Sequence, residues 1–185
     1  MKRIGLFIDG SNIYASARAL GFKVDFTKLL TYYKDQGEVV NAFYFTALPP
    51  KDVESPLRRM VDYVRYNGFS VIEKETREYI DPEGIKKLKG NMDVEIAVYA
   101  AETAVAMTHM VLYSGDGDFR CLIESMQRRH NIHCTVVAAR NLTANVLRSQ
   151  ANEYIDLVTL RDRFFHTMEA AEPVKTTKRW KLFSE

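Results

Sequence analysis

Short apolar runs alternate with longer amphipathic segments along most of the chain. The runs have the length and composition of buried strands and cover residues 2–8, 38–45, 69–72, 110–113, 132–137 and 154–158. The segments between them predict helices over residues 12–20, 26–36, 53–66, 91–107, 120–131, 142–152 and 161–171. Strands that alternate with helices indicate βαβ units, so the expected fold class is α/β with a mainly parallel central sheet.

Two segments interrupt this alternation. Residues 73–90 are highly charged and contain Pro82, Gly84 and several lysines, so we expect a mobile loop or a short hairpin there. Residues 172–185 are polar and basic, with Trp180 and Phe183 interleaved. We therefore expect one domain over residues 1–165, followed over residues 166–185 by the end of the last helix and a basic, aromatic tail.

Composition narrows the class of protein but does not identify its function. The 185 residues are 46% hydrophobic and 27% charged, an ordinary globular mixture, and the net charge of +2 permits nucleic-acid binding without arguing for it. We find no signal peptide and no apolar run that could span a bilayer, so we expect a cytoplasmic protein without a membrane partner. Cys121 and Cys134 fall in apolar runs, and we expect them to fill core space rather than form a disulfide.

Aspartates follow two of the expected strands. Residues Ser114–Phe119 (SGDGDF) lie between the run at 110–113 and a helix, and they place Asp116 and Asp118 on a strand-to-helix turn. The turn's glycines would permit tight or left-handed backbone. The first strand likewise ends in Asp9, followed by a glycine. Carboxyl ends of parallel strands are where ligands bind, although an aspartate at such a turn can also simply cap the helix.

A third segment brings another acid to the same edge. Asp93 falls in the first turn of the long helix that precedes the 110–113 strand, so this helix begins at the carboxyl edge of the sheet. Unpaired charges crowded together cost several kcal/mol each, on the order of the burial penalty of a single ion. A hard divalent cation with oxygen ligands removes that cost. The pattern therefore favours a metal site over a chance group of surface acids.

The order of these motifs resembles one known family. Residues 7–12 (FIDGSN), Lys89-Gly90 followed by Asp93, Ser114–Phe119, and the segment from Leu147 through residues 154–157 (YIDL) resemble the motifs of NYN domains. These domains form the LabA-like branch of the PIN-like nuclease superfamily. The resemblance runs in order from about residue 3 to residue 160. It implies a single Rossmann-like (PIN-like) domain with helices on both faces of the sheet.

The resemblance also implies a site and an activity. Related domains cut RNA at an acidic pocket that binds Mg²⁺ or Mn²⁺. By position, the acidic set is Asp9, Asp93, Asp116 and Asp118. Asn12 would contact a ligand phosphate or hold Asp9, and Ser114 would form hydrogen bonds within the pocket. Two positions depart from the family pattern, since Tyr99 and Asn152 stand where relatives often carry acids; we expect Asn152 to be structural.

These residues lead to the hypothesis of a metal-dependent endoribonuclease that hydrolyses phosphodiester bonds. Bare carboxylates repel a phosphodiester, and a bound divalent ion bridges the two and activates a water. We expect Asp9 and Asp116 to be direct metal ligands. Asp93 and Asp118 would bind a second ion or orient waters.

The RNA would also need cations near this rim, because phosphate contacts position a strand without reading its sequence. The candidates are Lys89 and Arg120, and further Arg18, Arg140 and Arg148. The tail around Trp180 could stack on a base, but it could also be disordered or pack on a second subunit of a homodimer. The histidines match no motif, so we expect surface or packing roles for them; they are His109, His130, His133 and His166.

Two other functions stay open at this point. A non-catalytic RNA-binding or regulatory NYN module is the main alternative, and Tyr99 favours it. A phosphatase of the haloacid dehalogenase type ranks lower. That chemistry needs a second aspartate two residues after the nucleophile, and Asp9 is followed there by Ser11.

Overall fold

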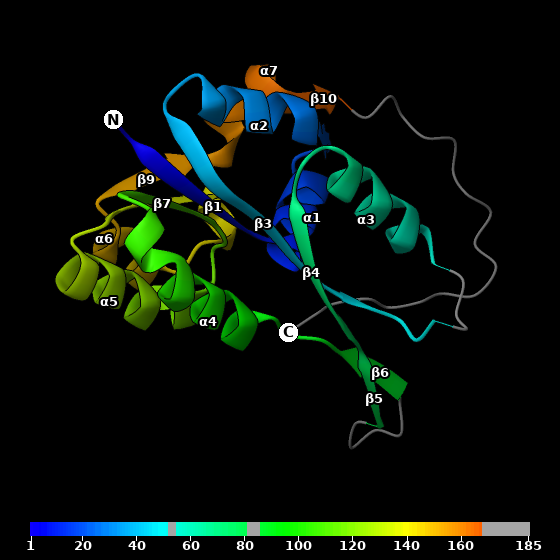
Figure 1. Cartoon of the computed structure of the whole chain (residues 1–185). Coiled ribbons are helices and arrows are strands. Elements are labelled where there is room, and N and C mark those ends of the chain that lie inside the picture. Colours follow the sequence, from blue (N-terminus) through cyan, green and yellow to red (C-terminus); the bar gives the residue numbers. More distant parts are fainter. Residues whose placement is uncertain (52–54, 81–85, 168–185) are drawn as a thin grey trace.

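The computed structural model describes residues 1–51, 55–80 and 86–167, without the side chains of 78–80, 86–89 and 165–167. Within these residues, six parallel strands form one sheet in the order β4-β3-β1-β7-β8-β9 (Figure 1). The strands are β1 (Arg3–Asp9), β3 (Glu38–Leu48), β4 (Ser70–Glu75), β7 (His109–Tyr113), β8 (His133–Ala138) and β9 (Glu153–Asp156). The expected parallel α/β domain is confirmed, with β4 and β9 at the edges.

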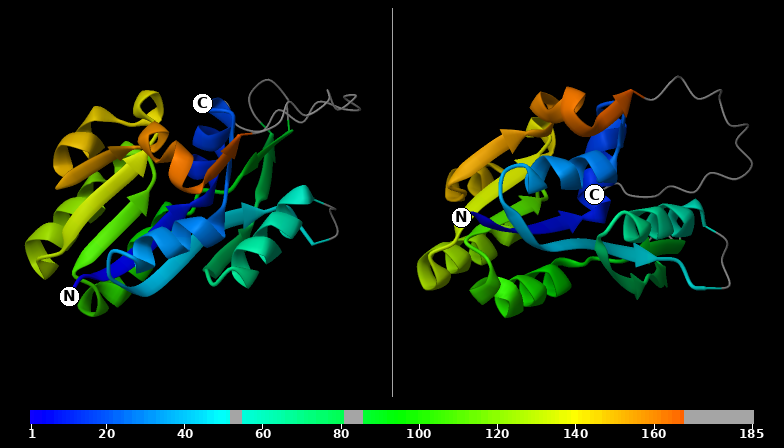
Figure 2. Two further views of the ribbon diagram at one scale, coloured as in Figure 1. Left: turned by 90° about the horizontal axis from the view of Figure 1, so that it is seen from above. Right: turned by 45° about the horizontal axis from the view of Figure 1, so that its top comes forward.

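Helices cover both faces of this sheet (Figures 1 and 2). One face carries α1 (Gly10–Ala19), α2 (Phe26–Lys34), α3 (Pro56–Tyr66) and α7 (Arg161–Phe164). The other face carries α4 (Asp93–Thr103), α5 (Arg120–His130) and α6 (Asn145–Gln150). Short 3₁₀ turns complete the chain path at η1 (Ala104–Ala106), η2 (Gly117–Phe119), η3 (Arg140–Leu142) and η4 (Leu157–Leu160).

The apolar strands explain why two cores form. Alternate residues of β1 point to opposite faces, so Leu6 and Ile8 pack in the core beneath α1 and α2, and Phe7 packs in the core beneath α4 and α5. On β7, Tyr113 joins the first core and Leu112 joins the second. Strands that are apolar on both faces are typical of a buried parallel sheet.

Aspartates begin several of the helical segments that follow strands. Asp9 caps α1, Asp25 follows the short strand β2 (Phe22–Val24) and caps α2, Asp116 caps η2, and Asp156 caps η4. Each side chain accepts a hydrogen bond from a backbone N–H of its helical segment, which would otherwise lack a partner. Capping therefore accounts for one role of Asp9 and of Asp116. Whether either aspartate has a second role depends on the groups around its carboxylate.

Some expected elements differ in the structure. The helix expected over 161–171 ends at Phe164, and β10 (Phe165–Thr167) instead pairs antiparallel with β2. Residues 73–90 hold the end of β4 and an antiparallel hairpin of β5 (Arg77–Ile80) and β6 (Lys86–Lys89), as one of our two alternatives expected. The tail from residue 168, with Trp180, lies outside the described residues. No helix in the described part is long and apolar enough to cross a membrane.

The two cysteines differ from each other. Cys134 is buried in the core beneath α5, as expected, but Cys121 is exposed on α5. The prediction for Cys121 was wrong because its neighbours Leu122 and Ile123, and not Cys121, occupy the inward face of the helix.

Candidate metal centre

The turn between β7 and α5 is built around a buried serine. Ser114 is fully buried, and its hydroxyl donates to Asp9 Oδ2 over 3.0 Å and accepts from the backbone N–H of Asp116 over 3.3 Å. Asp116 Oδ1 in turn accepts from the backbone N–H of Asp118 at 3.0 Å. The Ser114 hydroxyl therefore links the ends of the neighbouring strands β1 and β7. Ser114 was expected to form hydrogen bonds in this region.

Asp9 lies at the buried end of this network. Its Oδ1 accepts from the Ser11 hydroxyl at 2.7 Å and from the backbone N–H groups of Ser11 and Asn12 at 3.1 and 3.2 Å. Burial raises the pKa of the Asp9 carboxyl above its usual range, and the hydrogen bonds from Ser11, Asn12 and Ser114 offset part of that rise. Asn12 thus holds Asp9 through its backbone, which is one of the two roles expected for it.

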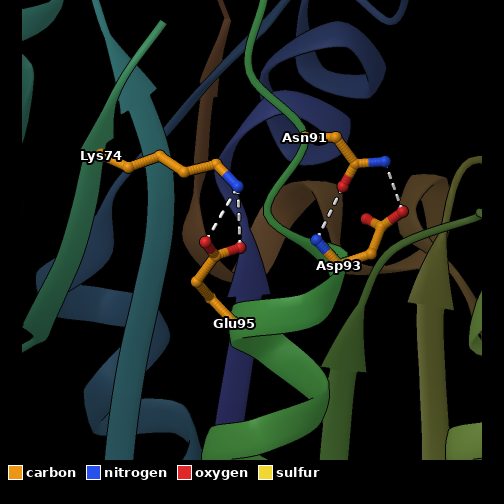
Figure 3. A network of polar contacts seen from close by, with 4 residues as sticks. All are labelled: Lys74, Asn91, Asp93 and Glu95. Carbon is orange, nitrogen blue, oxygen red and sulfur yellow. Dashed lines mark hydrogen bonds and ion pairs between the residues drawn. The ribbon is translucent and has the colours of Figure 1, made fainter.

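Asp93 starts α4 and is oriented by Asn91 (Figure 3). The Asn91 amide donates to Asp93 Oδ2 at 2.6 Å, and its carbonyl oxygen accepts from the Asp93 backbone N–H at 2.7 Å. Burial raises the pKa of the Asp93 carboxyl, and the negative charges of Asp116, Asp9 and Asp118 add to the rise, while the Asn91 hydrogen bond opposes it. Without a bound cation, the negative charges of these carboxylates, which come from separate segments, therefore repel one another.

Three carboxylates meet at this rim among the residues that the structure describes. Asp93, Asp116 and Asp118 each offer an oxygen, and these oxygens all lie within 4.8 Å of one another. Oxygen donors that are close, negatively charged and partly exposed fit a hard divalent cation. Asp9 lies beside this group without belonging to it. Its role as a direct metal ligand stays a prediction. The Asp9 carboxylate has lone pairs beyond those that its present hydrogen bonds use, so these bonds do not prevent it from binding a metal.

The glycines of the turn are needed for space and not for left-handed backbone. The positive-φ glycines of the described chain are Gly21 and Gly68, neither of them in this turn. A Cβ at Gly115 would collide with the backbone carbonyl of Leu142, and Ala144 donates a backbone hydrogen bond to the Gly115 carbonyl at 2.9 Å. The segment after β8 therefore packs directly against the acidic turn.

A salt bridge that the sequence did not reveal lies next to Asp93 (Figure 3). Lys74 of β4 donates to both carboxylate oxygens of Glu95 at 2.9 Å. Burial acts to raise the pKa of Glu95, but the hydrogen bonds and charge of Lys74 outweigh it and lower that pKa. Lys74, Arg77, Asn91, Asp93 and Glu95 all line a cleft of about 890 Å³. In the register of β3 with β4, Lys74 pairs with Ala47, and this pairing places Lys74 at the cleft. The sequence alone does not indicate that register.

The other expected cations lie in different places. Arg120 is exposed at the start of α5, directly after the acidic turn, whereas Lys89 ends β6 with its side chain outside the described part. Arg148 packs over the Tyr154 ring at 5.5 Å, a structural contact. Arg18 lines a separate groove on the face of α1. Arg120 therefore follows the acidic turn in the chain, Lys74 lines the cleft that contains Asp93, and Arg18 lines a different groove.

The residues that depart from the family pattern have structural contacts. The Tyr99 ring packs edge-on against Phe43 and Phe45, with ring centroids 5.2 and 5.7 Å apart. Asn152 Oδ1 accepts from the backbone N–H of Cys134 at 2.8 Å, which is the structural role expected for it.

The described histidines are consistent with the packing and surface roles expected of them. His109 and His133 face each other, 5.2 Å apart, at the amino ends of β7 and β8, the opposite end of the strands from the acids. His130 is exposed at the end of α5, and the side chain of His166 lies outside the described part.

The fold and this rim define an α/β domain with a carboxylate site at the carboxyl edge of a parallel sheet. The family model of the NYN domain matches residues 3–159, and the chain therefore belongs to the NYN domain family. Domains of this family are generally nucleases.

Two relatives match nearly the whole chain. Over 176 residues it is 32% identical to the low amplitude and bright protein LabA of Synechococcus elongatus, covering 93% of this chain and 92% of that protein. A crystal structure of a protein of unknown function from Vibrio parahaemolyticus superimposes with a TM-score of 0.73 at 28% identity. That match covers 89% of this chain and 96% of the other.

Proposed function

We propose that this protein is a metal-dependent endoribonuclease that hydrolyses phosphodiester bonds of single-stranded or structured RNA. The observation that carries the proposal is the group of Asp93, Asp116 and Asp118, whose oxygens approach within 4.8 Å at the carboxyl edge of the sheet. Membership of the NYN family supports a nuclease-type domain. The raised pKa of Asp93 supports a cation there, because nearby negative charges contribute to that rise.

In this proposal the three aspartates hold Mg²⁺ or Mn²⁺. Such an ion would lower the pKa of a bound water and stabilise the charge that develops on the phosphate. Asn91 orients Asp93 through two hydrogen bonds, and Asp116 keeps Asp118 in place through its backbone N–H. Asp9 and Ser114 hold the turn on β1. The chain thus fixes the acids before any ligand arrives, which lowers the cost of organising them during the reaction.

Cations of the chain would position the RNA. Arg120 is exposed beside the acidic turn, and Lys74 and Arg77 line the cleft that contains Asp93. Lys74 is held by Glu95, so its ammonium group has a fixed location from which to meet a phosphate. These groups contact the backbone of a strand and do not distinguish bases.

The test is cleavage of end-labelled single-stranded and structured RNAs with Mg²⁺, with Mn²⁺ or with a chelator. We expect metal-dependent cleavage by the wild type and none by the Asp116→Asn variant. Asp156→Asn is the matched control, because Asp156 also ends a strand and caps a 3₁₀ turn but lies outside the acidic group. Equal cleavage by wild type and Asp116→Asn would contradict the proposed site.

One observation keeps a second function in view. Tyr99 offers a ring where many relatives are expected to carry an acid, which favours an RNA-binding or regulatory NYN module without catalysis. Binding of metal and RNA without cleavage of any RNA would favour this alternative. Turnover of a phosphomonoester such as p-nitrophenyl phosphate would instead favour the phosphatase.

A further inference from the structure

A second concave site lies on the sheet face opposite α4. The groove runs between α1, β2 and α3 and has a volume of about 410 Å³, within the range of ligand pockets, which is about 300–1,000 Å³. Most of its lining is apolar or aromatic. Within the described residues its charged lining consists of Arg18 and Lys23, and no acid lines it. An apolar groove with a positive rim complements a ligand that joins a flat ring to a negative charge.

The lining of this groove includes a tyrosine hydroxyl. Tyr44 lines the groove, and its hydroxyl forms no hydrogen bond with another described residue, although it is not among the fully buried side-chain atoms of the described residues that lack a partner. A polar group of a ligand in the groove would form a hydrogen bond with this hydroxyl.

The same tyrosine connects the groove to the acidic rim. A Cβ at Gly10 would lie 2.8 Å from the Tyr44 hydroxyl oxygen, so that oxygen lies against the start of α1, directly after Asp9. Burial raises the pKa of Tyr44, and the charge of Asp9 adds to the rise. From this point the groove follows α1 through Tyr14 to Arg18, away from the acids.

We propose that this groove binds an unpaired nucleotide of the RNA, with its base in the groove, while the scissile phosphate lies at the acidic rim. The proposal rests on the proposed function and names how the substrate is held. Tyr14 and Tyr63 flank the groove with 52% and 45% of their surface exposed, which leaves ring area on which a base can stack. Arg18 and Lys23 face the phosphates of that nucleotide, and the Tyr44 hydroxyl bonds to the base edge.

The test measures binding apart from cleavage. Fluorescence anisotropy with a labelled single-stranded RNA, in the presence of a chelator, compares the wild type with Tyr63→Ala and Arg18→Ala. We expect the Kd of Tyr63→Ala to rise roughly tenfold, within the range for loss of one base–aromatic stack. Tyr66→Ala and Arg129→Ala are the matched controls, because Tyr66 is 90% exposed on the same helix outside the groove and Arg129 is exposed on α5. Their Kd should stay at the wild-type value.

A second variant tests the Tyr44 hydroxyl directly. Tyr44→Phe keeps the ring and its edge-on contact with Phe26, so the fold is retained. Loss of one neutral hydrogen bond should weaken binding by about three- to tenfold. Photocrosslinking of 4-thiouridine RNA should label residues of α1 and α3 in the wild type. Unchanged affinity in Tyr63→Ala and Tyr44→Phe, or crosslinks confined to α4 and α5, would overturn the proposal.

Failure of the groove can be separated from failure of the nuclease. Cleavage at the acidic rim with unchanged affinity in the groove variants would refute the groove alone. Tyr44-dependent binding of uridine or adenosine monophosphate, observed by NMR in a protein that cuts no RNA, would support the groove and refute the nuclease. A change of oligomeric state in Tyr63→Ala, without a change in RNA affinity, would make the groove a protein interface and overturn the proposal.

Discussion

Two neighbouring turns of this protein share a sequence pattern and differ in what surrounds their aspartates. Asp9 ends the central strand β1 and Asp116 follows the central strand β7 by three residues, and each precedes a glycine and caps a helical segment. Asp9 is buried and accepts hydrogen bonds from two backbone N–H groups and two hydroxyls. Asp116 is partly exposed, accepts from the Asp118 N–H, and shares its surroundings with two other carboxylates.

The difference shows how one local motif can serve structure and chemistry. The hydrogen bonds of Asp9 connect β1, α1 and the β7 turn, so its main contribution is to hold those segments together. Asp116 has a carboxylate oxygen close to those of Asp93 and Asp118, and a cation can bind between them. On this account, loss of Asp9 affects stability first and loss of Asp116 affects activity first.

The largest expected effect separates the two aspartates by activity. We expect Asp116→Ala to lower the rate of RNA cleavage by roughly 100-fold or more, because the ion contributes several kcal/mol of transition-state stabilisation. Its Tm should fall by no more than about 2 °C, because the capped segment is a single 3₁₀ turn. Initial cleavage rates and differential scanning calorimetry measure the two quantities. A rate loss matched by a large loss of Tm would remove the distinction.

Asp9→Ala should show the opposite balance. Removing the cap and leaving the buried Ser114 hydroxyl without its acceptor should lower the free energy of unfolding by about 1–3 kcal/mol, after relief of the buried charge. For a chain of this length, the Tm should fall by about 3–10 °C. Thermal unfolding by circular dichroism checks this, with Asp156→Ala as a control for loss of a cap alone. A Tm equal to that of wild type would contradict the structural role.

The two glycines of the acidic turn should rank by the space around them. Gly115→Ala drives a methyl group into the Leu142 carbonyl, which cannot move without shifting the backbone, so we expect a loss of about 1–3 kcal/mol. Gly117→Ala meets the side chains of Ala144 and Val146 at 3.1 and 3.3 Å, which can adjust, and should cost less. Urea unfolding curves of the two variants give the order, and a reversed order would refute the packing argument.

The smallest expected effect is a pH dependence of the metal-free protein. The pKa of Asp93 is raised in the folded state, so folding favours its protonated form. Its charge therefore opposes folding at neutral pH, and this cost disappears as the pH falls below the raised pKa. The Tm of wild type relative to Asp93→Asn should rise on acidification toward pH 4, and excess Mg²⁺ should abolish the difference at neutral pH. A relative Tm that falls on acidification would contradict it.

Much of the site could be predicted from strand ends. In a parallel sheet the carboxyl ends of all strands share one edge, so placing Asp116 after one strand and Asp93 at the start of the preceding helix was enough to predict their meeting. The position of Lys74 could not be predicted, because it depends on the register in which β4 pairs with β3. No local sequence pattern encodes that register. β10 was expected to be helical because its partner, β2, lies about 140 residues away in the sequence.

The distinction between Asp9 and Asp116 also lay beyond the sequence. Both read as an aspartate followed by a glycine after an apolar strand, and both were expected to be direct ligands. Burial by α1 and the Ser114 hydrogen bond separate them, and both depend on tertiary contacts. Gly115 was likewise expected to serve backbone conformation, whereas the close approach of Leu142 makes it necessary.

The most direct test of the central claim is calorimetric titration of Mn²⁺ into the metal-free wild type, Asp116→Asn and Asp156→Asn. The account predicts saturable binding to the wild type and to Asp156→Asn, and no measurable binding to a folded Asp116→Asn. Binding to Asp116→Asn with wild-type affinity would contradict the claim that the aspartates at the carboxyl edge of the sheet hold the metal.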